Sequence, residues 1–296
     1  MKRILFLILA TLFIFYSSGY TQTQLKVMTW NIWHGGSHGN EESQYQKDKS
    51  NTVNIIKVIK QNDPGILLMQ ETYDYGMEIG DKAGFLYSWR GSSNLSIHSK
   101  YEISDNLTLF KPFNSHGVVI EVEGRKVIFI NVWLHYLPDY FNDIKTLSPK
   151  MLIQNESGTR LKEIIAILTN INSLSIKYPG VLIIMGGDFN SGSHLDWIKS
   201  TKEWHYHKVV EWPVSKTIVT QGFTDSYREV FPNPNPTLEG TWGFLSEDII
   251  SDRIDFIYYK GRSIKTIFSK IIKDDPPGGF FNSDHRAVLS VFELNQ

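Results

Sequence analysis

Short apolar runs recur along the chain, and most of them lead into a small group of polar side chains. Residues 25–31, 66–69, 126–133 and 181–185 form such runs, and their length and apolar content predict strands. The polar residues are expected at or just after the ends of the runs. In chain order they are Thr29-Trp30-Asn31, Gln70-Glu71, His135, Gly187-Asp188-Phe189-Asn190, Arg253-Ile254-Asp255 and Ser283-Asp284-His285-Arg286. Strands packed side by side would bring these groups to one edge of a sheet, which restricts the chain to an α/β fold built around that edge.

Other segments complete the predicted α/β pattern. Residues 52–61 show helical spacing of apolar positions, and residues 156–176 carry a longer apolar stripe that predicts one amphipathic helix. No repeat, low-complexity linker or change in composition divides the sequence. We therefore expect residues 24–296 to form a single domain of two packed sheets with helices outside. Further strands are predicted over residues 94–99, 116–122, 253–259 and 287–292.

The first residues have the features of an export signal. Lys2 and Arg3 precede an apolar run over residues 4–16, and small residues follow at positions 17–19. The 13 residues of this run are short for a membrane span, which needs about 20. The sequence predicts a signal peptide over residues 1–23 and export to the periplasm or the extracellular space, with an uncleaved membrane anchor as the alternative.

The overall composition limits the partners and cofactors of the protein. The 296 residues carry a formal net charge of -1, so the chain lacks the basic excess of a general nucleic-acid binder. There is no cysteine, which excludes disulfides, thiolate metal ligands and cysteine nucleophiles. A metal would be bound by oxygen and imidazole, and this favours magnesium, calcium or manganese over zinc. No feature indicates a stable protein partner, and a monomer is expected.

The polar groups match the needs of phosphate-ester hydrolysis. The anionic oxygens of the ester repel a nucleophile and the leaving alkoxide is poor, so a catalyst must neutralise charge and activate water. Carboxylates such as Glu71 and Asp188 are ligands for hard divalent cations. A histidine such as His285 activates water best when a carboxylate holds its other ring nitrogen. Each group alone is also common in turns or on surfaces, and only their shared order along the chain indicates a site.

The ordered motifs together resemble an exported, bacterial-type member of the endonuclease/exonuclease/phosphatase superfamily. This superfamily includes pancreatic deoxyribonuclease, abasic-site endonucleases, bacterial sphingomyelinases and inositol polyphosphate 5-phosphatases. The resemblance extends over residues 25–294 and implies a four-layer α/β sandwich with two central, mostly antiparallel sheets flanked by helices. It rests on Thr29-Trp30-Asn31, Leu68-Met69-Gln70-Glu71, Trp133-Leu134-His135, Gly187-Asp188-Phe189-Asn190, Thr241-Trp242, Arg253-Ile254-Asp255 and Ser283-Asp284-His285-Arg286.

The resemblance also implies a metal site. Glu71 would be the principal metal carboxylate, Asn31 would support it, and Asp284 would lie at the same metal or at a second cation position. Magnesium is the favoured metal, with manganese and calcium as alternatives. Several relatives carry an acidic residue two places after the first asparagine, where this chain has Trp33, so Asn31 alone would contribute from that strand. Asn94 replaces a usual glycine of the family, which predicts a remodelled edge of the site.

The same resemblance assigns the catalytic groups. Asp188 and Asn190 would position the nucleophilic water and contact the phosphate. His285 would be either the general base or a stabiliser of phosphate charge, and Asp255 would orient it. His135 matches a second family histidine, and it would act as the leaving-group acid or as a phosphate ligand.

Loops beside these motifs are candidates for substrate recognition. His34 follows the first strand, Asp139 lies in an aromatic segment after His135, and Trp242 belongs to a motif of its own. We predict that His34, Asp139 and Trp242 bind substrate. Phe280-Phe281 directly precedes the last motif, and apolar loops beside a cleft suit an amphiphilic or membrane-borne diester.

We therefore expect an exported, divalent-metal-dependent phosphoric-ester hydrolase, in which an activated water attacks phosphorus in line with the leaving oxygen. A phosphodiester is the preferred substrate class, either small or lipid-like. Nucleic acid and a phosphomonoester are the alternative substrates. The rival from another functional class is a non-catalytic binding protein that retains the fold.

Overall fold

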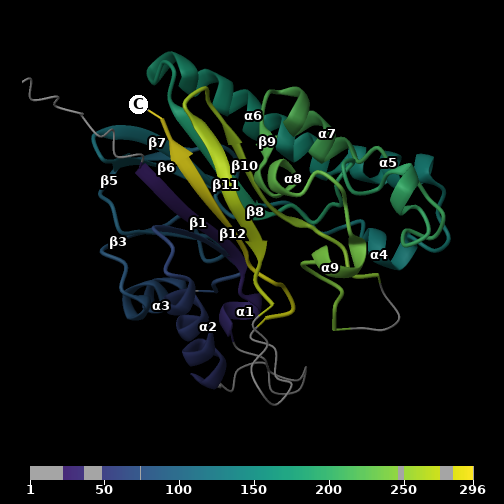
Figure 1. The fold of residues 1–296 in the computed structure, drawn as a ribbon, viewed down its shortest axis with the longest axis horizontal. Coiled ribbons are helices and arrows are strands. Elements are labelled where there is room, and N and C mark those ends of the chain that lie inside the picture. The colour runs from purple at the N-terminus through teal and green to yellow at the C-terminus, as the bar shows by residue number, and fades with distance from the viewer. Residues whose placement is uncertain (1–22, 37–48, 74, 246–249, 274–282, 296) are drawn as a thin grey trace, which may run out of the picture.

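The protein forms two six-stranded sheets that pack face to face (Figure 1). The predicted signal peptide and the Phe280-Phe281 pair lie outside the described residues, apart from Thr23 at the start of the first strand. The computed structural model describes residues 23–36, 49–73, 75–245, 250–273 and 283–295.

Each sheet has one parallel pair of strands at its centre. The first sheet consists of β11 (Ile264–Ile271), β12 (Val288–Leu294), β1 (Thr23–Asn31), β2 (Ile66–Gln70), β4 (Ser96–Ser99) and β3 (Tyr87–Arg90), in that spatial order. The second consists of β5 (Ile103–Thr108), β6 (Ser115–Val122), β7 (Arg125–Trp133), β8 (Leu182–Asp188), β10 (Asp255–Lys260) and β9 (Thr224–Asp225). The pairs β1–β2 and β7–β8 are parallel, and the other neighbouring pairs are antiparallel. The prediction of two mostly antiparallel sheets is confirmed.

Helices cover the outer face of each sheet, as Figure 1 shows. Helices α2 (Lys49–Asn62) and α3 (Gly76–Ala83) pack on the first sheet, and α6 (Arg160–Lys177) and α7 (Pro213–Thr220) pack on the second. The order helix, sheet, sheet, helix is the four-layer sandwich that the family resemblance implies. None of the described helices is long and apolar enough to cross a membrane. The shorter helices are α1 (Trp33–Gly36), α4 (Tyr140–Asp143), α5 (Pro149–Gly158), α8 (Ser226–Val230), α9 (Pro236–Glu239) and a 3₁₀ turn (Lys199–Thr201).

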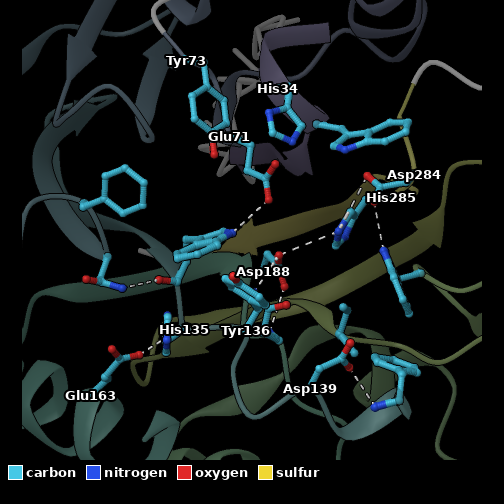
Figure 2. A pocket seen from close by; sticks show the side chains of 18 of the residues that line it. His34, Glu71, Tyr73, His135, Tyr136, Asp139, Glu163, Asp188, Asp284 and His285 are labelled. Carbon is cyan, nitrogen blue, oxygen red and sulfur yellow. Dashed lines mark hydrogen bonds and ion pairs between the residues drawn. The ribbon is translucent and has the colours of Figure 1, made fainter. Parts of the chain in front are cut away.

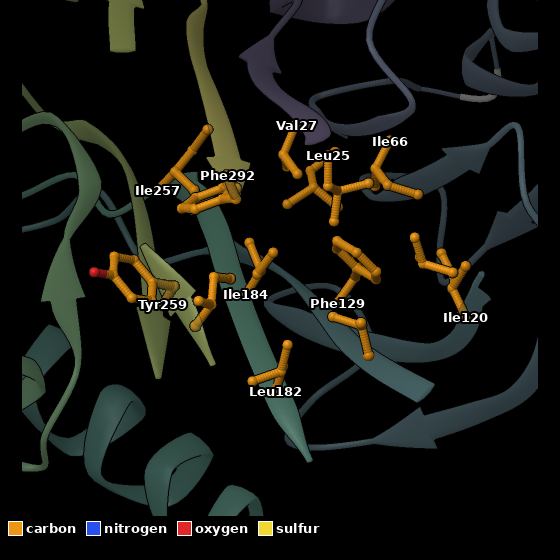
Figure 3. Close-up of a cluster of buried hydrophobic side chains, with 14 of the residues drawn as sticks. Leu25, Val27, Ile66, Ile120, Phe129, Leu182, Ile184, Ile257, Tyr259 and Phe292 are labelled. Atoms are coloured by element: carbon orange, nitrogen blue, oxygen red, sulfur yellow. The ribbon is translucent and has the colours of Figure 1, made fainter. Parts of the chain in front are cut away.

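Alternate residues of the central strands enter two different cores. Leu25 and Val27 of β1 belong to the cluster between the sheets, where they meet Phe129 of β7 and Ile184 of β8 (Figure 3). Met28 of the same strand belongs to the cluster beneath the helices of the first sheet. A strand that is buried on both faces has no polar side, so its sequence is an almost continuous apolar run. These runs therefore predict the interior strands well.

The helix predicted over residues 156–176 is divided in the structure, so the single-helix prediction is wrong. Helix α5 ends at Gly158 and α6 begins at Arg160, and Thr159 between them has φ −129° and ψ −90°, outside the helical region. Glu156 and Arg160 are both completely buried. Two buried charged residues interrupt the apolar stripe at this point, and their polar ends are directed to the loops beside the site described next.

Candidate active site

The interior strands bring the predicted polar residues to one end of the sandwich. Asn31 ends β1, Glu71 follows β2 and Asp188 ends β8. Asp255 begins β10 and His285 precedes β12, so the expectation that every group follows a strand end is wrong for these two. Both strands are antiparallel to their neighbours, and their first residues therefore lie beside the last residues of β8 and β1.

Asn31 is completely buried and connects the acidic and basic groups. Its Nδ2 donates to Glu71 Oε1 at 3.1 Å and to Asp188 Oδ2 at 3.0 Å, and it lies 3.4 Å from Nε2 of His285. Its amide oxygen accepts the backbone N–H of Trp33 at 3.0 Å, which assigns the amide nitrogen to the side of the carboxylates. Asn31 thus supports the carboxylate of Glu71 through a hydrogen bond.

The imidazole of His285 lies among three carboxylates. Its Nδ1 is 2.9 Å from Oδ2 of Asp255, and its Nε2 is 3.9 Å from Oδ2 of Asp188 and 4.0 Å from Oδ1 of Asp284. Burial disfavours the charged ring, but Asp255, Asp284 and Asp188 together raise the pKa of His285 well above its ordinary value. The three carboxylates therefore favour the positively charged imidazolium form of His285.

The carboxylate of Asp188 is held by its neighbour in the sequence. Oδ1 accepts the backbone N–H of Asn190 at 2.8 Å, and Oδ2 accepts Nδ2 of Asn190 at 3.1 Å. The same Nδ2 donates to the carbonyl oxygen of Leu134 at 2.9 Å, which connects this loop to the end of β7. Burial raises the pKa of Asp188 to about 7, although the imidazolium of His285 opposes the shift. Asp188 can therefore exchange a proton near neutral pH.

These groups form the floor of a pocket of about 750 Å³ (Figure 2). Asn31 and Asp255 lie behind the floor, where they contact side chains that line the cavity. The structure thus brings all the predicted site residues together, and their chemical roles stay predictions. The predicted residues that line the pocket are His34, Glu71, His135, Asp139, Asp188, Asn190, Trp242, Asp284 and His285.

The three residues predicted to bind substrate differ in their own contacts. The ring of His34 stacks on Tyr73, with centroids 5.0 Å apart and an angle of 13° between the planes. Asp139 caps helix α4, because its Oδ1 accepts a backbone N–H of the first turn at 3.0 Å. Trp242 donates its indole N–H to Oδ2 of Asp284 at 3.1 Å. His34 and Trp242 therefore line the walls of the pocket. One oxygen of the Asp139 carboxylate accepts a hydrogen bond from the first turn of α4.

Two functional contacts are not predicted from the sequence. The indole nitrogen of Trp133 donates to Oε1 of Glu71 at 3.3 Å, and Oε2 of Glu163 accepts the backbone N–H of His135 at 2.8 Å. Trp133 belongs to a recognised motif, which is the only signal for it. Glu163 lies in an amphipathic helix, where a glutamate is ordinary surface. Both residues line the pocket.

Asn94 occupies the edge of the site that is predicted to be remodelled. Its Oδ1 accepts the backbone N–H of Glu71 at 3.0 Å, and its Nδ2 donates to the carbonyl oxygen of Phe113 at 2.9 Å. It therefore holds Glu71 in the left-handed backbone region, which a non-glycine residue adopts at an energetic cost. Other pocket residues share this backbone region, with φ between 39° and 48°: Trp33, His34, Tyr73 and Asn190.

The residues of the site fit a divalent metal ion. In the described part of the chain, ligand atoms of Asp188, Asp255 and His285 all lie within 4.8 Å of one another. Oδ1 of Asp255 and Oδ1 of Asp284 are buried and accept no hydrogen bond from the described residues, so each retains an oxygen for a cation. Glu71 adds a further carboxylate to the lining of the pocket. Carboxylate oxygens of this kind suit a hard cation.

A family model decides the relationship to known proteins. The model of the Endonuclease/Exonuclease/phosphatase family matches residues 28–285, which is most of the chain. The protein belongs to this family. Members of the endonuclease/exonuclease/phosphatase family hydrolyse phosphoester bonds, and carboxylates and histidines line the pocket of this protein.

Individual relatives resemble the protein over nearly its whole length. An uncharacterized Caenorhabditis elegans protein, F14F9.5, is 29% identical over 285 residues, which cover 88% of this chain and 86% of that protein. TDP2 of D. rerio, solved with a single-strand DNA product, has a TM-score of 0.61 at 14% identity and covers 91% of this chain and 99% of its own. The human nocturnin catalytic domain, solved with a bound sulfate anion, has a TM-score of 0.60 at 13% identity, covering 93% and 98%. At these identities the two solved structures show a shared fold.

Proposed function

We propose that the protein is an exported, divalent-metal-dependent phosphodiesterase of the endonuclease/exonuclease/phosphatase family. The observation that carries the proposal is the charge of the pocket. Its lining residues include the carboxylates of Glu71, Asp139, Glu163, Asp188 and Asp284, whereas Lys111 is the one lysine or arginine among the described residues that line it. A phosphate anion would be repelled by such a pocket unless a cation neutralised the carboxylates.

The cation would lie among the carboxylates at the pocket floor. Glu71 and Asp284 would hold it, with Asn31 fixing the orientation of Glu71 through the hydrogen bond of 3.1 Å. When bound, the metal neutralises phosphate charge and stabilises the charge that develops during attack. Magnesium is the expected metal, and manganese and calcium are the alternatives.

Different residues of the pocket would carry the two proton transfers of the reaction, one from the attacking water and one to the leaving oxygen. Asp188 would take a proton from the attacking water, since it is oriented by both N–H groups of Asn190. His285, held by Asp255, would face the phosphate oxygens as a cation. His135, which also lines the pocket, would protonate the leaving oxygen. The attack would be in line with that oxygen.

The walls of the pocket favour a diester with organic groups on both sides. Aromatic side chains surround the floor: Trp33, Tyr73, Phe113, Trp133, Tyr136, Phe141 and Trp242. Such walls bind apolar or planar groups, whereas Lys111 alone gives little grip on the repeated phosphates of a nucleic acid. A small or lipid-like phosphodiester is therefore the proposed substrate class. Nucleic acid is the second candidate, because aromatic walls also stack bases and the related D. rerio TDP2 was solved with a DNA product.

A substrate panel tests the proposal. Folded protein is incubated with bis-p-nitrophenyl phosphate, p-nitrophenyl phosphate, plasmid DNA or a phosphocholine lipid, with magnesium, manganese or calcium, and with EDTA as the control. We expect metal-dependent release from the diesters and none in EDTA. Faster hydrolysis of DNA or of the monoester would replace the proposed substrate class, and no hydrolysis of any substrate would favour a binding protein.

Export is tested separately, on cells that express the complete chain. The expected product is a protein outside the cytoplasm whose N-terminus lies near residue 24. A full-length protein recovered with the membrane would indicate the uncleaved anchor, and a full-length protein in the cytoplasm would contradict export.

A further inference from the structure

The segment that follows β7 has no regular secondary structure, and it is held by contacts to the site. The backbone N–H of Leu134 donates to the carbonyl oxygen of Asp188 at 3.0 Å, and its carbonyl oxygen accepts Nδ2 of Asn190 at 2.9 Å. The N–H of His135 donates to Oε2 of Glu163 at 2.8 Å. Backbone polar groups in folded proteins need partners, and here the Asp188 carbonyl and the side chains of Asn190 and Glu163 supply them.

A single nitrogen of Arg160 organises the rest of the segment. Its Nη1 donates to the carbonyl oxygens of His135, Tyr136 and Pro138 at 3.1, 3.0 and 3.0 Å. Three carbonyl oxygens from one short segment can bond to a single nitrogen only if the backbone of residues 135–138 curves around that nitrogen. Arg160 is the first residue of α6, so the break between α5 and α6 places its guanidinium beneath this curl.

The stability of the fold alone does not explain an arginine at this position. Arg160 is completely buried, and so is Glu156, the acidic residue whose charge it faces. Glu156 Oε1 in turn accepts Ser191 Oγ at 3.0 Å and the N–H of Val214 at 2.9 Å. Burying an arginine near a carboxylate often stabilises a protein no more than apolar side chains of similar volume would. An apolar residue at position 160 could not make the three hydrogen bonds to the carbonyl oxygens of His135, Tyr136 and Pro138.

We propose that Arg160 is a positioning residue, which sets where the His135 ring and the Tyr136 ring stand in the pocket, with Glu163 as the second anchor. Figure 2 shows His135 and Tyr136 at the pocket, with the bond from His135 to Glu163. The two rings lie 5.3 Å apart, and Tyr136 is half exposed. The proposal rests on the proposed function, in which His135 protonates the leaving oxygen.

The first test compares two buried arginines. Arg160→Lys keeps the positive charge, but the lysine ammonium ends one bond short of Nη1, the nitrogen that donates to the three carbonyls. We expect kcat for the diester to fall about 100-fold, as for a displaced catalytic group. Arg228→Lys is the matched control, because Arg228 is also buried and bonded to Asp196 and Glu239. It should lower the melting temperature and leave kcat within about threefold. Equal kcat losses in the two variants would overturn the proposal.

A double-mutant cycle then asks whether Arg160 acts through His135. In the His135→Ala background, Arg160→Lys should lower kcat by less than about threefold, since the group that it positions is already gone. A loss of about 100-fold in both backgrounds would show that Arg160 acts elsewhere. If Arg160→Lys does not fold, Glu163→Ala takes its place in the same cycle, because Glu163 is only partly buried.

A readout without activity separates this proposal from the proposed function. The His135 imidazole resonance is assigned by its loss in His135→Ala. We expect it to shift in Arg160→Lys and in Glu163→Ala and to stay in place in Arg228→Lys. An unchanged His135 resonance in the first two variants would overturn the positioning role. A shifted resonance in a protein that hydrolyses no substrate would retain the positioning role and reject the proposed function.

Discussion

At the level of single residues, the site depends on side chains that hold other side chains. Glu71 receives N–H groups from Asn31 and Trp133, which come from different sheets. The role of Asn31 is implied by the family resemblance, through the motif Thr29-Trp30-Asn31. The contact of Trp133 cannot be predicted, because the sequence of an apolar strand does not reveal where an indole N–H points. The direction of that group depends on packing against Phe113 and Tyr136.

The charge of Glu71 should be essential for metal binding. Glu71→Gln keeps an oxygen for the N–H groups of Asn31 and Trp133 but removes the charge that attracts a cation. We expect magnesium affinity, measured by titration calorimetry, to fall more than about tenfold and the metal-dependent activity to be lost. Glu78→Gln on the exposed face of α3 is the control, since Glu78 pairs with Lys82. An unchanged affinity in Glu71→Gln would remove Glu71 from the metal site.

Asp255 should act on catalysis through the charge of His285. Asp255→Asn retains the shape of the side chain but removes the carboxylate that faces Nδ1 at 2.9 Å. The pKa of His285 should then fall toward its ordinary value, and kcat should fall by about 10²- to 10³-fold. NMR titration of His285 and steady-state kinetics measure the two effects. Asp105→Asn, at a surface ion pair with Lys177, is the control, and a kcat within about threefold of the wild type in Asp255→Asn would contradict the role.

At the level of elements, the sequence predicts the interior strands and misses the edges. The strands that it does not predict are β3, β5, β9 and β11, and these are the outer strands of the two sheets. Their side chains alternate between exposed and buried or remain largely exposed, as in β3 and β5. An apolar run marks a strand that is covered on both faces, and an edge strand gives no such run. The division between α5 and α6 is missed for a related reason, because the contacts of Arg160 are made by distant segments.

The close approach of β7 and β8 makes Gly187 irreplaceable. A Cβ at Gly187, where φ is 155°, would lie 1.9 Å from the carbonyl oxygen of Val132. Gly187→Ala should lower the free energy of unfolding by about 3 kcal/mol or more, since backbone must move. Gly124→Ala is the control: φ is 77° there, but nothing lies within 4 Å, so it should cost about 1 kcal/mol. Urea unfolding of both variants checks this, and equal costs would show that the contact with Val132 is not decisive.

At the level of the whole molecule, the site spans both sheets, so the contact between the sheets sets its geometry. Nε2 of Gln70 in the first sheet donates to Oδ1 of Asn131 in the second at 2.6 Å. Nδ2 of Asn131 returns to the carbonyl oxygens of Met69 and Ser96 at 2.8 and 2.9 Å. Gln70 directly precedes Glu71, so these polar contacts lie next to the site. The four-layer order is implied by the family resemblance, but this cross-sheet register depends on side-chain packing that one sequence does not reveal.

Buried histidines give the fold a defined response to acid. Burial lowers the pKa of His98 to about 3 and those of His116 and His205 to about 4. The unfolded chain binds protons at these residues near pH 6.5, so their contribution to stability is complete above that pH and is lost as the pH falls toward 4. Glu156 and Asp188, whose pKa values burial raises to about 7, act in the opposite direction. A substitution of one histidine therefore isolates the contribution of that residue to the pH dependence of stability.

His98→Gln should make unfolding less sensitive to acid. His98 bonds to Ser88 Oγ at 2.6 Å and Ser96 Oγ at 2.9 Å, and a glutamine keeps polar atoms there without binding a proton. Between about pH 4 and pH 6, the slope of the unfolding free energy against pH should fall by about 1.4 kcal/mol per pH unit, which is one proton. Urea unfolding at about pH 4.5, 5.5 and 7.5 measures the slope, with the exposed His207→Gln as control. Equal slopes in wild type and His98→Gln would mean that His98 takes up a proton in the folded protein as readily as in the unfolded chain.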